Sequence, residues 1–293
     1  MIVQRAAERL RTHVEALAGA IGERHIWRYA SLLQAAEYIA TELRTSGYEP
    51  VQQSYEIARL PVSNIEASLK GTSRASEVVV LGAHYDTVVG CPGANDNATG
   101  VAAMLELASR FASRAHARTI RFVAFVNEEP PFFRTPRMGS VVYANAARAR
   151  GDRITAMLAL ETMGYYSDDR GSQRYPAAVA RFYPDVGNFI GLVSNVRSAR
   201  LLMKARRAFR QRSAFPVQAA AVPAAIPGVG WSDHWSFWQA GYQAMMVTDT
   251  APFRYPWYHM AEDTPDKISA GKLAGVVDGL EHVVTVLAGG TSG

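Results

Sequence analysis

Histidines and carboxylates of this 293-residue chain stand where apolar stretches of strand length end. These stretches span residues 78–83, 120–126 and 157–160. The side chains near such ends, or in the loops between them, that could do acid–base or metal chemistry are His84, Asp86, Asp96, Glu128, Glu129, Glu161 and His259. Parallel strands of an open sheet bring their carboxyl ends to one edge, where ligands bind. The spacing therefore predicts that these side chains share one site.

Two histidines and three carboxylates are suited to binding a pair of divalent metal ions that activate water. A carboxylate has two oxygens and can bridge ions about 3.5–4 Å apart. If Asp96 is the bridge, His84 and Glu161 are left for one ion, and Glu129 and His259 for the other. Zinc is the expected metal, two ions in all, with Co²⁺ or Mn²⁺ as alternatives.

The adjacent carboxylates Glu128 and Glu129 can divide two roles between them, one binding metal and the other serving the attacking water. We predict that metal-activated water attacks a carbonyl and that Glu128 is the general base, which passes the proton to the leaving amine. Asp86 lies two residues after His84. It is expected to accept the second imidazole N–H and fix the tautomer of the ring.

The elements that must position these residues alternate between strands and helices, which predicts an α/β fold with a mixed, mostly parallel central sheet and helices on both faces. The first strands are expected to include antiparallel pairs. The expected strands are 51–57, 64–69, 77–83, 119–126, 154–161, 188–193 and 244–249, and the expected helices are 3–21, 32–45, 98–111, 140–150, 198–212, 232–239 and 266–287. Two stretches rich in Gly, Pro and Ala, 168–184 and 219–230, are expected to be loops. Residues 1–293 are expected to form a single domain, with the N-terminal helices of residues 1–47 packed on it and no inserted lid domain.

Composition argues against several other classes of protein. The net charge is +5, but the basic residues are spread along the chain rather than collected in one run, so no nucleic-acid binding is expected. No apolar run reaches the length of a membrane span, and charges interrupt residues 1–22, which predicts a cytoplasmic protein; a removed signal peptide would leave the same sequence. The single cysteine, Cys91, excludes an internal disulfide framework, and no metal role is expected for it.

Five motifs resemble the M28 family of zinc aminopeptidases over roughly residues 30–290. They are HYD (84–86), GANDNATG (93–100), NEE (127–129), LETMGYY (160–166) and YH-x-x-x-D-T (258–264). The resemblance implies the phosphorylase/hydrolase-like fold of the zinc exopeptidases. It also implies zinc ligands at His84, Asp96, Glu129, Glu161 and His259, and Glu128 as the base. Glu161 stands where many members have aspartate, and residues 130–138 replace a shorter connection that follows the glutamate pair.

The expected substrate is a peptide or an aminoacyl compound with a free N-terminus, whose amine would be recognised by carboxylate oxygens. The resemblance places Ser232, Asp233 and His234 near the site and implies that Tyr258 lines it. His234 is expected to be a packing residue rather than a ligand. Four aromatic residues could form an apolar pocket that accepts the first side chain of the substrate: Phe132, Phe133, Phe253 and Trp257. The oligomeric state is left open by the sequence.

Three other functions compete with the aminopeptidase. A glutaminyl-peptide cyclotransferase of the same fold would use a single zinc ion, but the segment after Asp96 is uninterrupted, as is typical of peptidases. A catalytically inactive interaction domain would have lost ligands, and none is missing here. A carboxypeptidase or amide hydrolase of the related M20 type would insert a lid domain before the last histidine, where this chain predicts continuing sheet and helices.

Overall fold

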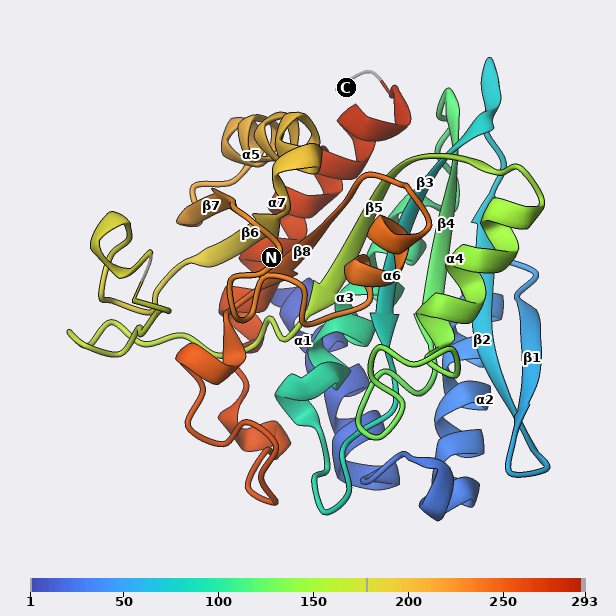
Figure 1. Ribbon diagram of the computed structural model, residues 1–293, viewed down its shortest axis with the longest axis horizontal. Coiled ribbons are helices and arrows are strands. Elements are labelled where there is room, and N and C mark those ends of the chain that lie inside the picture. Colours follow the sequence, from blue (N-terminus) through green and yellow to red (C-terminus); the bar gives the residue numbers. More distant parts are fainter. Residues whose placement is uncertain (1, 178, 291–293) are drawn as a thin grey trace.

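Eight strands form one sheet in the computed structural model, which describes residues 2–177 and 179–290 (Figure 1). The strands are β1 (Val51–Ile57), β2 (Leu60–Leu69), β3 (Arg74–His84), β4 (Arg118–Phe125), β5 (Arg153–Glu161), β6 (Ile190–Ser194), β7 (Val217–Ala221) and β8 (Ala244–Thr248). Their order in the sheet is β1-β2-β4-β3-β5-β8-β6-β7. The pairs β1–β2, β2–β4 and β6–β8 are antiparallel, and the other four neighbouring pairs are parallel. The predicted mixed, mostly parallel sheet is therefore confirmed.

Helices cover both faces of this sheet. The helices are α1 (Ile2–Val14), α2 (Tyr29–Thr45), α3 (Thr99–Phe111), α4 (Gly139–Ala149), α5 (Ala199–Arg212), α6 (His234–Gln239) and α7 (Ala270–Ala288). One hydrophobic cluster joins the sheet to α1, α2, α3, α5 and α7, and a second joins the opposite face to α4 and α6. Burial on both faces explains why the central strands read as continuous apolar runs rather than as alternating ones.

Strand β3 shows how the core positions the site. Val78 and Val80 pack in the cluster with α4 and α6, whereas Val79 and Leu81 pack in the cluster with α3 and α7. Alternate side chains of a strand point to opposite faces, so every residue of this segment is covered. His84 is the last residue of the strand and emerges at its carboxyl end.

Most predicted elements occur within a few residues of their expected bounds, and the exceptions have local causes. The first predicted helix is α1 continued by a wider π-helical segment, Glu15–Ile21. Strand β7 was missed because its sequence, VQAAA, has neither alternation nor strong strand formers. The last helix begins at Ala270, after a 3₁₀ turn over Pro265–Lys267.

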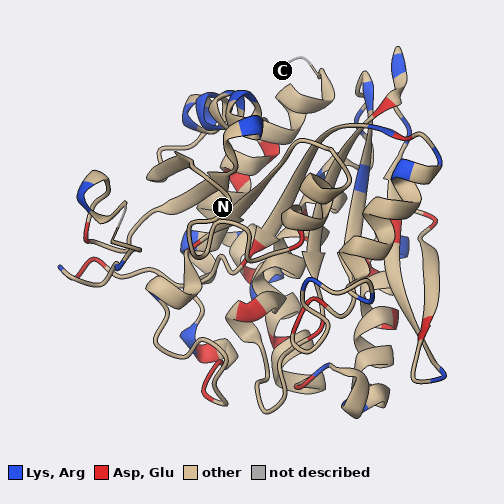
Figure 2. Cartoon of the chain, in the orientation of Figure 1, with Lys and Arg blue, Asp and Glu red and all other residues tan. Residues whose placement is uncertain are grey.

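Basic side chains gather on one helix, whereas the sequence predicted that they are spread along the chain. Helix α5 carries six of them and is the densest basic element in Figure 2: Arg200, Lys204, Arg206, Arg207, Arg210 and Arg212. Among the helices of residues 2–177 and 179–290, none combines the length and the apolar character needed to cross a membrane.

Candidate active site

The candidate ligands meet at the carboxyl-terminal edge of the central strands. His84 ends β3 and Glu161 ends β5, while Glu129 lies in the loop that follows β4. Asp96 lies at a kink, with φ of −112° and ψ of 89°, in the segment Ala94–Ala98 that leads into α3, and His259 comes from the loop between β8 and α7. These five residues are separated by up to 175 positions in the sequence, and the sheet topology brings them together.

The five side chains form two groups of three that share Asp96. In one group, His84 Nε2 lies 3.2 Å from Asp96 Oδ1 and 3.4 Å from Glu161 Oε2. In the other, His259 Nε2 lies 3.1 Å from Asp96 Oδ2 and 3.4 Å from Glu129 Oε2. Within each group the three ligand-type atoms lie within 4.8 Å of one another. The two oxygens of Asp96 thus face different histidines, which is the arrangement expected of a carboxylate that bridges two cations.

The residues present fit a pair of divalent metal ions. Four of their buried atoms have no hydrogen-bond partner: His84 Nε2, His259 Nε2, Asp96 Oδ1 and Glu129 Oε1. Buried polar atoms are nearly always paired in native proteins, so a cluster of unpaired atoms pointing at one another calls for a ligand. Imidazole nitrogens and carboxylate oxygens are the donors that zinc binds in sites with an open position.

Burial in this centre raises the pKa of carboxyl groups, because it disfavours their charged forms. Desolvation raises the pKa of Glu129 to about 7, and it raises the pKa of Glu128 well above its ordinary range. Burial alone would lower the pKa of His259, but the neighbouring carboxylates of Asp96 and Glu129 raise that pKa to about 10. Burial disfavours the charged forms of these carboxylates, and a bound divalent cation would favour them.

Asp86 fixes the backbone that carries the glutamate pair. Its Oδ1 accepts the N–H of Glu128 at 3.0 Å and its Oδ2 accepts the N–H of Glu129 at 3.1 Å. The Nδ1 of His84 lies 3.2 Å from the backbone carbonyl of Asp86 and 3.6 Å from its carboxylate. The sequence predicted the imidazole contact, but the carboxylate makes its hydrogen bonds to the two glutamate amides, and the closer acceptor for the ring is the carbonyl.

Two further residues hold ligands in place and were given no role from the sequence. Asp263 accepts the N–H of Asn95 at 2.8 Å and the N–H of Asp96 at 3.1 Å, so it anchors the turn that presents Asp96. Ser232 donates its hydroxyl to Glu161 Oε2 at 2.7 Å. Asp263 lies in the last recognised motif, and the family resemblance places Ser232 near the site; these were the available signals.

Unusual backbone conformations cluster at the same place. His259 itself has φ of 60°, Asn127 before the glutamate pair has φ of 57°, and Thr162 after Glu161 has φ of 43°. Residues other than glycine adopt this left-handed region rarely and at a cost in energy, and such conformations concentrate at functional sites. The surrounding core therefore imposes the directions in which these ligands point.

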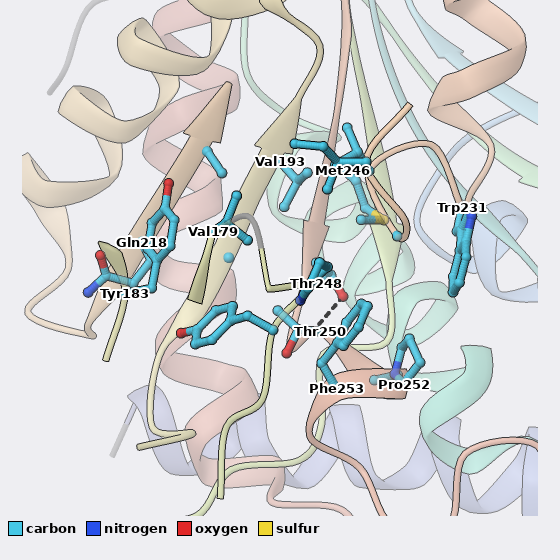
Figure 3. Close-up of a pocket in the computed structure, with 18 of the residues that line it drawn as sticks. Val179, Tyr183, Val193, Gln218, Trp231, Met246, Thr248, Thr250, Pro252 and Phe253 are labelled. Carbon is cyan, nitrogen blue, oxygen red and sulfur yellow. Dashed lines mark hydrogen bonds between the residues drawn. The ribbon is translucent and has the colours of Figure 1, made fainter. Parts of the chain in front are cut away.

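An apolar cavity of about 110 Å³, shown in Figure 3, lies beside the ligand cluster. Glu161 and Tyr258 are part of its lining. Strands β6, β7 and β8 and the loops near them form its walls. The labelled side chains in Figure 3 include Val193, Met246, Trp231 and Phe253. The Trp231 and Phe253 rings stack with their centroids 6.5 Å apart. Among the described lining residues, Glu161 is the only aspartate, glutamate, histidine, lysine or arginine.

The substrate-binding residues expected from the sequence divide between this cavity and other places. Tyr258 lines the cavity and stacks on His259, their ring centroids 3.9 Å apart. Asp233 is buried and neither of its oxygens has a hydrogen-bond partner; burial raises its pKa to about 7. Phe253 is also part of the wall, although it was only one of several aromatic candidates.

Three of the expected pocket residues lie outside the cavity lining. Phe132 stacks with Trp27 at a centroid distance of 6.2 Å, and Phe133 lies beneath the Arg134 guanidinium. Trp257 packs against Tyr165 and Tyr255. A contact of these three side chains with substrate remains a prediction.

The two residues that were set apart from the metal ligands are buried in other contacts. His234 Nε2 lies 2.8 Å from the carbonyl oxygen of Val229, and the ring packs against Trp238. Cys91 Sγ lies 3.8 Å from Asp263 Oδ2. Neither residue belongs to the two groups of ligand-type atoms that share Asp96.

The fold and the site define a class of protein: a mixed α/β protein whose strand ends carry a buried histidine–carboxylate centre. Residues 64–284 match the family described as Peptidase family M28. Over 289 residues the chain is also 35% identical to the uncharacterized protein YfbL of Escherichia coli (strain K12), covering 96% of this chain and 87% of YfbL. The chain therefore belongs to peptidase family M28.

Solved structures show the same fold at low sequence identity. A zinc aminopeptidase from Bacillus subtilis matches with a TM-score of 0.77 and 16% identity, covering 97% of this chain and 95% of that chain. The glutaminyl cyclase of Fimbriiglobus ruber matches with a TM-score of 0.69 and 21% identity, covering 96% and 95%. The fold is thus shared by proteins described as peptidases and by proteins described as cyclases, and the site must distinguish between these activities.

Proposed function

We propose that this protein is a zinc-dependent aminopeptidase with two zinc ions in one site. The observation that carries the proposal is the pair of three-residue groups joined by Asp96, each with one histidine and a further carboxylate. The similar fold of the Bacillus subtilis zinc aminopeptidase supports zinc as the metal. His84, Asp96 and Glu161 would hold one ion, and His259, Asp96 and Glu129 would hold the other.

Zinc in this site would supply Lewis acidity, polarising a bound carbonyl and making a nearby water more acidic. Glu128 would accept the proton of that water and deliver it to the leaving amine. It is suited to this role because it is buried beside the ligands, its pKa is raised by burial, and Asp86 holds its backbone N–H. Positioned bases of this kind contribute about 10²–10⁴-fold to the rate.

The apolar cavity supports removal of an N-terminal residue with an apolar side chain. Because Glu161 lines both the cavity and the ligand cluster, a side chain in the cavity places the adjoining amine and carbonyl at the metal ligands. The free amine would be held by carboxylate oxygens through charge-assisted hydrogen bonds. The Tyr258 hydroxyl remains protonated because burial raises its pKa well above the ordinary range, so it can donate to the substrate carbonyl.

The decisive experiment compares Glu128→Gln with Glu129→Gln. Glu128→Gln should keep its zinc and lose at least about 100-fold in kcat on leucine p-nitroanilide, because it removes the base and no ligand. Glu129→Gln should lose zinc as well, measured by elemental analysis after dialysis. Glu106→Gln is the matched control, since Glu106 is buried in an ion-pair network with Arg9 and Arg110 and should retain both zinc and activity. Equal zinc loss in Glu128→Gln and Glu129→Gln would contradict the division of roles.

Glutaminyl cyclisation is the second candidate, favoured by the shared fold of the Fimbriiglobus ruber enzyme. It predicts formation of pyroglutamate from a peptide with N-terminal glutamine and a single zinc ion per chain. The second ligand group, with His259 and Glu129, supports the peptidase instead, because it provides donors for a second ion. Incubating the zinc-loaded protein with a glutaminyl peptide and a leucyl peptide, followed by mass spectrometry, separates the two activities: cyclisation removes ammonia, whereas hydrolysis releases the first residue.

A further inference from the structure

Arg24 is a fully buried arginine that lies beneath the loop leading to Asp96. Its side chain is 0% exposed and forms no ion pair with a carboxylate among the described residues. The residue precedes the segment 64–284 that matches the peptidase family. A buried charge is costly unless its donors are all satisfied, so the structure must compensate this guanidinium in another way.

The compensation comes from five hydrogen bonds to backbone carbonyls. Nε donates to Tyr85 at 2.8 Å; the two N–H groups of Nη1 are shared among Leu17, Gly22 and Pro92, whose carbonyl oxygens lie at 2.8, 2.7 and 2.7 Å; and Nη2 donates to Gly93 at 3.1 Å. Tyr85 directly follows the ligand His84, and Gly93 lies three residues before Asp96. One side chain therefore joins the end of the N-terminal helical segment to both boundaries of the loop that separates two metal ligands.

The main chain of Arg24 strengthens the same connection. Its N–H donates to Thr87 Oγ1 at 3.0 Å, and its carbonyl accepts the N–H of Thr87 at 2.8 Å. The space around the guanidinium is closed. A Cβ added at Gly93, which has φ of 66°, would meet the Asp96 carbonyl oxygen and Thr87 at 2.4 Å and Arg24 Nη2 at 3.1 Å. The loop cannot shift without breaking these contacts, so its position and that of the guanidinium are coupled.

We propose that Arg24 is a positioning residue for the metal centre, which sets the place of Asp96 through the carbonyls of residues 85, 92 and 93. The proposal rests on the ligand set of the proposed function. Because Asp96 belongs to both ligand groups, a displaced loop weakens the binding of both ions together. Loss of Glu129 or Glu161 weakens the binding of one ion. The buried positive charge also interacts electrostatically with the carboxylates of Asp263, Asp86 and Asp96.

The substitution Arg24→Lys separates geometry from charge. Lysine keeps the positive charge but has three donors on one atom and no planar fork, so it cannot serve carbonyls on opposite sides. Titration calorimetry of the metal-free protein with Zn²⁺ should show both binding events weakened by about 10- to 100-fold, the range seen when groups that orient metal ligands are changed. Arg110→Lys is the matched control: it removes a guanidinium from the network of Glu106, Asp278 and Glu281, and it should bind Zn²⁺ like the wild type.

The outcomes distinguish this proposal from the proposed function. A wild type that binds no Zn²⁺ would refute the ligand assignment and, with it, the role of Arg24. A wild type that binds Zn²⁺ at two sites, together with an Arg24→Lys protein of unchanged affinity, would overturn the positioning role alone. If Arg24→Lys does not fold, Thr87→Val tests the same connection by removing the acceptor of the Arg24 N–H. Reduced Zn²⁺ affinity at both sites then supports the proposal, and wild-type affinity overturns it.

Discussion

Replacing Asp86 by asparagine should impair the placement of the glutamate pair, and of Glu128 in particular. The Asp86 carboxylate is buried and accepts two backbone N–H groups, from Glu128 at 3.0 Å and from Glu129 at 3.1 Å. Asparagine retains one acceptor oxygen and presents an NH₂ group to the second N–H, which is left unpaired. Losing a hydrogen bond to a charged group and leaving a buried donor unsatisfied costs about 2–3 kcal/mol.

If that cost falls on the placement of Glu128 in the transition state, kcat drops by about 30- to 150-fold, since about 1.4 kcal/mol corresponds to a factor of ten. The assay is the steady-state hydrolysis of leucine p-nitroanilide, with zinc content and melting temperature measured on the same samples. Asp152→Asn is the control: Asp152 accepts hydrogen bonds from Arg121 and Arg150 away from the site, so its loss should lower stability without changing kcat. Wild-type kcat and melting temperature in Asp86→Asn would refute the reasoning.

Three other predictions follow from the same geometry. In the metal-free protein, burial raises the pKa of Glu129 and that of Asp233, each to about 7. The folded state therefore binds more protons than the unfolded state. As a result, the free energy of unfolding falls as the pH rises from about 4.5 through 7. The melting temperature of chelated protein should therefore be lower at pH 8 than at pH 5, and the opposite order would be inconsistent with these shifts. Ser232→Ala removes the donor to Glu161 Oε2 and should weaken the binding of Zn²⁺ at one of the two sites by about tenfold. Calorimetry should show this as a change in one binding event. Weaker binding at both sites would show that Ser232 acts elsewhere. Trp231→Ala opens the apolar cavity and should raise KM for leucyl and phenylalanyl substrates with little effect on kcat, whereas an unchanged KM would place the first side chain of the substrate outside this cavity.

The strand ends that carry the candidate ligands could be predicted from the sequence because their chemistry and their context are both distinctive. His84 and Glu161 are polar residues at the ends of long apolar runs, and such runs are typical of buried parallel strands. Helix and strand bounds followed from the same patterns. Strand β7 was missed because three consecutive alanines do not carry the alternation that marks a strand at the edge of a sheet.

The residues that support the site were much harder to predict, because they act through contacts that depend on the complete fold. Arg24 is ordinary in its local sequence, and Ser232 was placed near the site without a partner; their partners lie up to 69 and 71 positions away, respectively. The wall of the apolar cavity likewise comes from three strands and their loops. Phe132 and Trp257 looked equally suitable for a pocket in the sequence, but they pack against Trp27 and against two tyrosines.

The central claim is that the two ligand groups joined by Asp96 hold two zinc ions that are required for hydrolysis. It is tested most directly by adding Zn²⁺ stepwise to the chelated protein while following both bound metal and hydrolysis of leucine p-nitroanilide. The expected result is saturation at two ions per chain, with activity absent at zero metal and fully restored at saturation. Full activity of the metal-free protein, or saturation at one ion with no hydrolysis of the leucyl substrate, would contradict the claim.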